Sequence, residues 1–126
     1  MAKKLTAVKG RFKPKYPAKY DGNHNKITYR SLWERRFMLY CDRSDQIFMW
    51  SSEELHIPYI SSKDGNWHNY YPDFVIKTCD NRTIVVEIKP KYQTGWEINK
   101  SKWTFAEQLC DKHGWEFKVL TENELF

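Results

Sequence analysis

An acidic and a basic side chain stand together near the end of one predicted strand. Glu87 and Lys89 are two residues apart in the stretch 84–90, so in an extended chain both point to one face while the alternate, apolar residues point to the other. Pro90 cannot donate to a sheet ladder, so pairing is expected to stop there and to leave both groups at the exit of the strand. A carboxylate beside an ammonium group can bind ions and move protons, but the same pair also suits a solvated strand face.

A second carboxylate belongs to the strand that comes before. Asp73 lies in an extended segment predicted over residues 67–77, and the turn-forming residues Cys79-Asp80-Asn81 separate it from the strand with Glu87. A connection this short predicts an antiparallel hairpin, in which the start of one strand lies beside the end of the next. We therefore expect Asp73 to lie close to Glu87 and Lys89.

A third carboxylate lies at the start of a predicted helix, at residues 31–42. Ser31 can cap this helix, and Glu34 three residues later completes a capping box. At 100° per residue, Glu34 projects onto the flank of the apolar face, which places a carboxylate beside the core. A capping role alone would explain a glutamate at position 34. One side chain can nevertheless both cap a helix and take part in catalysis. The predicted apolar stripe consists of Trp33, Phe37, Tyr40 and Cys41.

The remaining elements predict a mixed sheet with helices packed on it. Two extended pieces are expected at 46–50 and 55–60, a second helix at about 99–113, and a last strand at 115–120. The order helix, strands, hairpin, helix, strand indicates an α/β (α+β) fold. The chain of 126 residues suits one domain with a real core.

Positive charge is concentrated at the N-terminus. Residues 1–19 hold seven basic side chains and no acidic one, whereas the other 107 residues carry a net charge of −2. With two prolines and interleaved aromatic residues, this segment predicts an extended basic arm, residues 1–22, before a single domain, residues 23–126. Such an arm suits a nucleic-acid backbone or a solubilising tail, and its removal is expected to leave the domain folded. Its basic residues are Lys3, Lys4, Lys9, Arg11, Lys13, Lys15 and Lys19.

Several classes of protein do not fit the sequence. The three cysteines are far apart and the four histidines show no zinc-binding spacing. No apolar run is long enough to span a membrane, and the first residues are too polar for a secretory signal. We therefore expect a cytoplasmic protein that does not act at a membrane.

The chemically active residues resemble a nuclease motif. Pro72-Asp73, a spacer and Glu87-Ile88-Lys89 are similar to the motif of the PD-(D/E)XK nuclease superfamily, which has a restriction-endonuclease-like core. Further motifs over about residues 10–93 resemble one branch, the head completion nucleases of tailed phages. The N-terminal domain of TnsA-type transposases shares the acidic helix and the strand pattern. The motifs of the phage branch are Gly10-Arg11-Phe12-Lys13-Pro14, Tyr29-Arg30-Ser31-Leu32-Trp33-Glu34, Trp50-Ser51-Ser52-Glu53-Glu54, Ile57-Pro58-Tyr59 and Tyr71-Pro72-Asp73-Phe74.

The resemblance implies metal-dependent hydrolysis of phosphodiester bonds. Asp73, Glu87 and the backbone carbonyl of Ile88 are the implied ligands, and such oxygen ligands suit Mg²⁺ or Mn²⁺. Glu34 is expected to hold a second metal ion or its water ligands. Lys89 is expected to orient or deprotonate the attacking water and to offset charge in the transition state.

DNA and virion proteins are the implied partners. The resemblance implies trimming of packaged DNA during head completion and head–tail joining, in the host cytoplasm or at the head–tail junction, with the portal or neck as a further partner. The alternatives are a TnsA-like transposon-end endonuclease, or a joining or DNA-binding protein with little catalysis. The residues expected to contact DNA are Lys9, Arg11, Lys13, Lys15, Lys19, Arg30 and Lys91.

Overall fold

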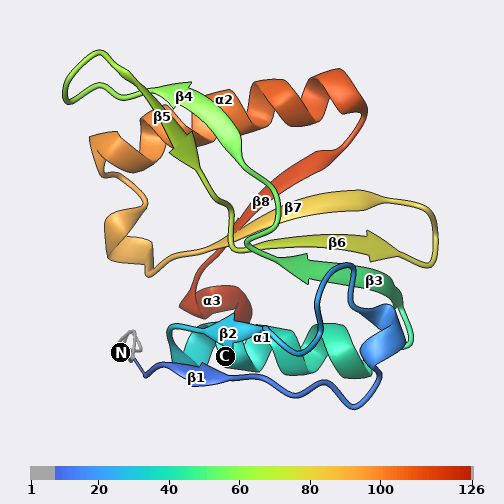
Figure 1. Cartoon of the computed structure of the whole chain (residues 1–126). Coiled ribbons are helices and arrows are strands. Elements are labelled where there is room, and N and C mark those ends of the chain that lie inside the picture. The colour runs from blue at the N-terminus through green and yellow to red at the C-terminus, as the bar shows by residue number, and fades with distance from the viewer. Residues whose placement is uncertain (1–7, 126) are drawn as a thin grey trace.

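A four-stranded sheet lies between two long helices in the computed structural model, which describes residues 8–125 (Figure 1). The strands are β1 (Gly10–Arg11), β2 (Thr28–Tyr29), β3 (Ile47–Ser52), β4 (Ile57–Ile60), β5 (Trp67–Tyr70), β6 (Phe74–Thr78), β7 (Thr83–Ile88) and β8 (Glu116–Leu120). The helices are α1 (Leu32–Arg43), α2 (Glu97–His113) and α3 (Glu122–Leu125), and two short 3₁₀ turns are η1 (Pro17–Lys19) and η2 (Lys91–Gln93).

The central sheet is mixed, with the order β3-β6-β7-β8. β6 pairs antiparallel with both β3 and β7, and β8 pairs parallel with β7. Parallel neighbours need a crossover connection, and α2 supplies it between β7 and β8. The predicted α+β class, a mixed sheet flanked by helices, is confirmed. No helix within residues 8–125 is long and apolar enough to cross a membrane.

The hairpin of β6 and β7 forms as predicted, but the strand before it is broken. A single strand was expected over residues 67–77, whereas β5 ends at Tyr70 and β6 begins at Phe74. β5 pairs with β4 in a separate two-stranded sheet, and buried Pro72, which has no N–H to donate, lies in the gap. The break places Asp73 just before β6, outside the ladder, so its side chain is free to turn toward the end of β7.

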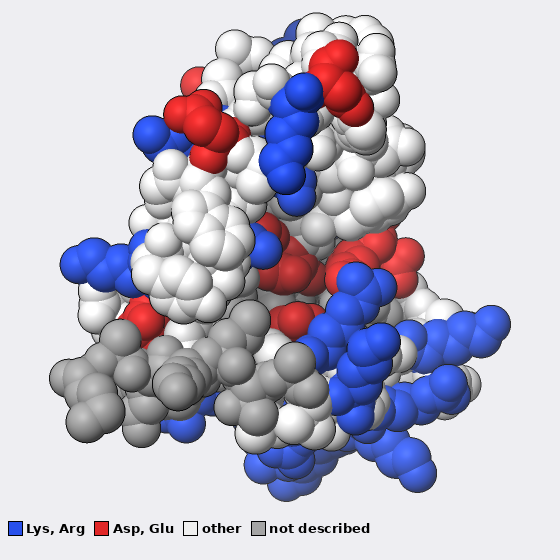
Figure 2. All heavy atoms as spheres, turned by 90° about the vertical axis from the view of Figure 1, so that its left-hand side faces the viewer, with Lys and Arg blue, Asp and Glu red and all other residues white. Residues whose placement is uncertain are grey.

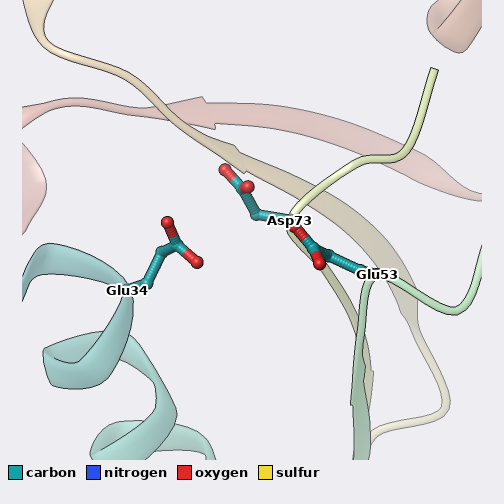
Figure 3. Close-up of side chains that lie close together, drawn as sticks. All are labelled: Glu34, Glu53 and Asp73. Carbon is teal, nitrogen blue, oxygen red and sulfur yellow. The ribbon is translucent and has the colours of Figure 1, made fainter. Parts of the chain in front are cut away.

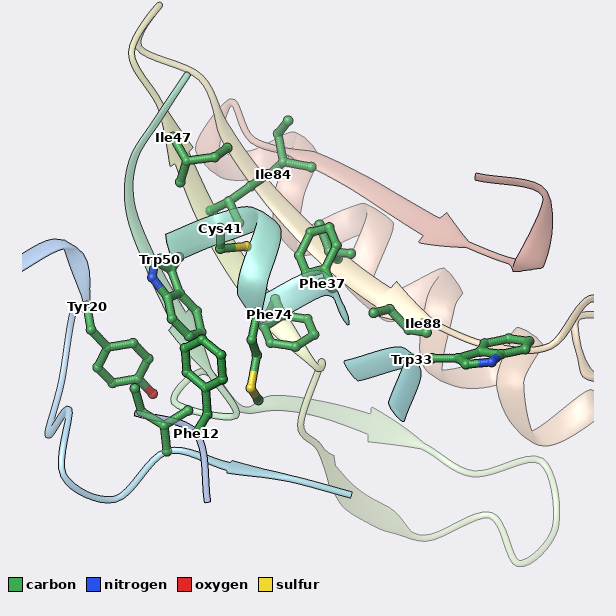
Figure 4. Packing of buried hydrophobic residues seen from close by; sticks show 14 residues of the cluster. Phe12, Tyr20, Trp33, Phe37, Cys41, Ile47, Trp50, Phe74, Ile84 and Ile88 are labelled. Carbon is green, nitrogen blue, oxygen red and sulfur yellow. The ribbon is translucent and has the colours of Figure 1, made fainter. Parts of the chain in front are cut away.

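The first helix begins at its predicted cap. Glu34 N–H donates to the Ser31 hydroxyl at 3.1 Å, and the Arg30 N–H donates to the Glu34 carboxylate at 3.4 Å. The predicted stripe is buried except for Tyr40, which is 49% exposed, and Met38 is fully buried instead. The buried face of α1 is shifted because the N-terminal segment covers it as well as the sheet (Figure 4).

The second helix covers the other side of the sheet. α2 begins two residues earlier than expected, and it ends where Gly114 adopts the left-handed conformation, with φ of 74°. Its residue Ala106 is buried in a second apolar cluster, together with Tyr59 and Tyr70 of the β4–β5 hairpin. This packing fixes α2 across the face of the sheet opposite α1 (Figure 1).

The N-terminal segment is part of the core in the region that the structure describes. Phe12 and Tyr20 are 4% and 6% exposed, and both rings pack edge-on against Trp50 at centroid distances of 5.9 and 4.8 Å (Figure 4). The backbone N–H groups of Lys15 and Tyr16 donate to the buried Asp42 carboxylate at 2.8 and 3.0 Å. The prediction of an extended arm, residues 1–22, before a domain that begins at residue 23 is therefore wrong for residues 10–20, which pack with the core of the domain. Residues 1–7, with Lys3 and Lys4, lie outside the described part of the chain.

This packing predicts that Phe12 is needed for folding. We expect Phe12→Ala to lower the free energy of unfolding by about 3–5 kcal/mol, because it leaves a cavity beside Trp50. Urea unfolding measures the loss. Phe48→Ala removes the same ring from a position that is 61% exposed and is the matched control, expected to cost only about 0.5 kcal/mol. Equal losses in the two variants would contradict this role for the N-terminal segment.

Candidate active site

Asp73 joins the ends of three strands. Its Oδ2 accepts the backbone N–H of Ile88, the last residue of β7, at 2.7 Å. Its backbone carbonyl accepts the N–H of Glu53, which directly follows β3, at 3.2 Å. Asp73 itself directly precedes β6. The structure thus places Asp73 at the end of β7, where the hairpin argument predicted it.

Glu87 and Lys89 approach this point from β7. Glu87 is only 4% exposed, and its Oε1 has no hydrogen-bond partner among residues 8–125. Its Oε2 lies 3.8 Å from Lys89 Nζ. Because side chains alternate along β7, Val86 packs in the core with α1 whereas Glu87 points to the side of α2 and Tyr70. The Oε1 atom of this buried carboxylate is therefore available to accept a hydrogen bond or to bind a cation.

Glu34 and Glu53 complete an acidic cluster around Asp73. Carboxylate oxygens of these three residues lie within 4.8 Å of one another, with Glu34 reaching in from α1 and Glu53 from the end of β3 (Figure 3). Sequence reasoning predicted Glu34 but missed Glu53. Its position depends on a left-handed backbone, with φ of 56°, which turns the chain out of β3 and which no residue type there predicts. Arg30 forms an ion pair with Glu53 at 3.3 Å.

Burial raises the pKa of Glu34, Asp73 and Glu87, and repulsion from a neighbouring carboxylate adds to this effect for Glu34 and Asp73. Burial, followed by the charge of Asp73, raises the pKa of Glu34 to about 7. Burial and the neighbouring Glu87 raise the pKa of Asp73 well above its ordinary value, and burial also raises the pKa of Glu87. Like charges that raise one another's pKa are expected where a fold collects ligands for a cation.

The donor set fits a hard divalent cation. Within residues 8–125 the cluster offers carboxylate oxygens and no histidine or cysteine, which suits Mg²⁺, Mn²⁺ or Ca²⁺ better than Zn²⁺. Asp73, Glu34 and Glu53 stand together in this cluster, and Glu87 adjoins it through Asp73. The backbone N–H of Ile88 donates to Asp73. That the carbonyl of Ile88 is a metal ligand stays a prediction.

The predicted DNA-contacting residues differ in their surroundings. Lys19 Nζ donates to the carbonyls of Asp42 and Ser44 at 3.0 and 2.8 Å, where it caps the end of α1. The Arg11 guanidinium donates a hydrogen bond to the backbone carbonyl of Asn25 at 3.2 Å, and Arg30 forms its ion pair with Glu53. Arg11 and Arg30 remain exposed although they have these partners, and the side chains of Lys9, Lys13, Lys15 and Lys91 are exposed as well. Figure 2 shows acidic side chains in a hollow at the middle of one face, bordered by a group of Lys and Arg side chains.

Two comparisons with known proteins agree with this geometry. The family model described as TnsA-like endonuclease N terminal matches residues 44–122. A head completion nuclease of Enterobacteria phage T4 is 33% identical over 141 aligned residues, which cover 94% of this chain and 94% of that protein. The family match supports the predicted restriction-endonuclease-like fold, and the resemblance to head completion nucleases is confirmed. The matched segment contains Glu53, Asp73, Glu87 and Lys89, whereas Glu34 lies before it.

The raised pKa of Glu34 predicts a stability that depends on pH. In the folded chain Glu34 keeps its proton up to about pH 7, whereas the unfolded chain loses it near the ordinary value of 4.5. Stability should therefore fall as pH rises between these values, and the raised pKa values of Asp73 and Glu87 act in the same direction. We expect the melting temperature of the parent, measured in chelator, to fall as pH rises over this range. The melting temperature of Glu34→Gln, a variant that keeps the helix cap, should fall less.

Glu107→Gln, an exposed change on α2, is the control and should behave like the parent. Excess Mg²⁺ should restore the parent's melting temperature at the higher pH, because the ion binds the folded state. An unchanged slope in Glu34→Gln would contradict the role given to this carboxylate.

Proposed function

We propose that the acidic cluster of this chain binds a divalent metal ion, Mg²⁺ or Mn²⁺, and that the protein uses this ion to hydrolyse phosphodiester bonds of DNA. The chain belongs to the TnsA-like endonuclease N-terminal family. The observation that carries the proposal is the position of Asp73. One carboxylate adjoins Glu34 and Glu53 on one side and Glu87 on the other, and Lys89 stands 3.8 Å from Glu87. Acidic ligands and a lysine at one strand end are the parts that metal-assisted hydrolysis needs.

Each residue has a definite part in this reaction. A bound ion would polarise the scissile phosphate and ease the deprotonation of water. Asp73, Glu87, Glu34 and Glu53 are the side chains that would hold it, with the Ile88 carbonyl as a further ligand. Lys89 orients or deprotonates the attacking water, and its positive charge offsets the charge that develops on the phosphate. Lys9, Lys13, Lys15 and Lys91 are exposed and available to contact the DNA backbone.

We infer that the biological role is head completion. The identity with the phage T4 head completion nuclease extends over nearly the whole of both chains, which supports a shared role as well as a shared fold. The protein would trim packaged DNA so that a filled head accepts a tail. Its partners would be DNA and the portal or neck, and its place the host cytoplasm during assembly, with retention at the head–tail junction.

The first test concerns Lys89. We expect the parent to nick supercoiled plasmid with Mg²⁺ and to stop when chelator is added. Lys89→Ala should abolish cleavage while DNA affinity changes little, since one phosphate contact is a small part of binding. Lys77→Ala, which removes an exposed lysine at the far end of β6, is the matched control and should cleave like the parent.

Lys89→Arg separates two roles, because guanidinium does not give up a proton at ordinary pH. No activity would support proton transfer, and partial activity would support orientation of the water. Undiminished nicking by Lys89→Ala would refute the assignment of this site.

The second test concerns head completion. Filled heads made without this protein are mixed with tails and with either the parent or Lys89→Ala, and infectious particles are counted. We expect the parent to restore infectivity and Lys89→Ala to fail. Full restoration by Lys89→Ala would show that the chain joins heads to tails without cutting DNA, which is the structural alternative.

A further inference from the structure

A second lysine approaches the acidic site from α2. Lys102 is partly buried, and its Nζ lies 5.8 Å from the centroid of the Tyr70 ring. This ammonium group forms no hydrogen bond or ion pair within residues 8–125. A cation over an aromatic face is attracted to it, so Tyr70 holds the end of the lysine side chain in place.

Lys102 stands among the charges of the site. The pKa of Lys102 is lowered, mainly by burial and then by the positive charge of Lys89. The negative charges of Glu87 and Asp73 raise it. Lys102 in turn lowers the pKa of Glu87. Two lysines, Lys89 directly after β7 and Lys102 on α2, therefore face the same pair of carboxylates.

The packing of α2 fixes this position. Trp103, the next residue, packs with Tyr70 and Ala106 in the apolar cluster between α2 and the β4–β5 hairpin. The helix cannot turn Lys102 into solvent without removing Trp103 from that cluster. The fold thus keeps a partly desolvated ammonium group beside a second ammonium, and the nearby carboxylates of Glu87 and Asp73 partly compensate the cost of this arrangement.

Charge balance indicates which anion is expected. A bound divalent ion favours the ionised form of all four carboxylates, Glu34, Glu53, Asp73 and Glu87, which stand with Lys89, Lys102 and Arg30 around the site. The two positive charges of the ion, added to those of the three basic side chains, then exceed the negative charge of the carboxylates. Lys102 is then free to attract an incoming anion, and each nucleotide of DNA brings one phosphate charge.

We propose that Lys102 binds a phosphate group of DNA at this site, from the α2 side of Glu87, and so holds the phosphate that is cut. This proposal rests on the proposed nuclease function. Lys102 makes the contact with its ammonium group, and Tyr70 is a positioning residue that acts through it. The nuclease motif of β6 and β7 does not include Lys102, because it belongs to the crossover helix.

The test replaces the charge and keeps the chain length. Lys102→Met retains an unbranched side chain against Tyr70, and Lys100→Met, at an exposed position of the same helix, is the matched control. We expect Lys102→Met to slow single-turnover plasmid cleavage by about tenfold or more. Lys100→Met should cleave like the parent. Melting curves in chelator should show both variants folded.

A second readout separates a phosphate contact from a structural role. The cut position is mapped in a duplex, and one neutral methylphosphonate is placed there. Affinity is measured with Ca²⁺ and with chelator, so that binding is read apart from cleavage. Lys102→Met should bind the ordinary duplex several-fold more weakly than the parent, and the two proteins should bind the methylphosphonate duplex equally well. A loss of the same size on both duplexes would overturn the proposal.

The two proposals fail in different ways. If the parent cleaves and Lys102→Met cleaves as fast as Lys100→Met, the inference about Lys102 is wrong and the nuclease function stands. If the parent does not cleave with any divalent ion, the proposed function is wrong. The Lys102 proposal, which rests on that function, is then overturned with it, whereas the first outcome overturns the Lys102 proposal alone.

Discussion

The hydrogen bond from the Ile88 N–H to the Asp73 carboxylate, 2.7 Å long, is the contact on which the site depends. It holds Asp73, in the gap between β5 and β6, against the end of β7. The hydrogen bond from the Glu53 N–H to the Asp73 carbonyl holds the end of β3 against the same residue. A buried donor or acceptor left without a partner costs free energy, so these bonds determine where the three strands end. The acidic residues then meet because their strands end together.

The site is held together by the core and not by its own charges. Phe74, adjacent to Asp73, is fully buried and packs on Phe37 of α1 at a ring distance of 4.8 Å. This contact presses α1 against the sheet and holds Glu34 near Asp73, although the two carboxylates repel each other. Repulsion of this kind lowers the stability of the metal-free chain and raises its affinity for a cation. The core supplies the free energy that keeps the ligands in position.

Local patterns predicted the parts of the site that local rules govern. The capping box placed Glu34 at the start of α1, and strand alternation with a short hairpin placed Asp73 beside Glu87. Glu53 was missed because its position follows from an unusual backbone angle. The N-terminal segment was misjudged because its basic residues dominate the composition. The core contacts of Phe12 depend on Trp50, a residue far along the chain.

Topology explains why a lysine outside the motif reaches the site. β8 lies parallel to β7, so the chain must cross over the sheet between these strands, and α2 makes that crossing. Glu87 points to the face that α2 covers, because Val86 and Ile88 occupy the face toward α1. A residue of the crossover helix is thereby placed beside Glu87 by the path of the chain. The two helices supply opposite charges to one strand end, since α1 brings the carboxylate of Glu34 and α2 brings the ammonium of Lys102.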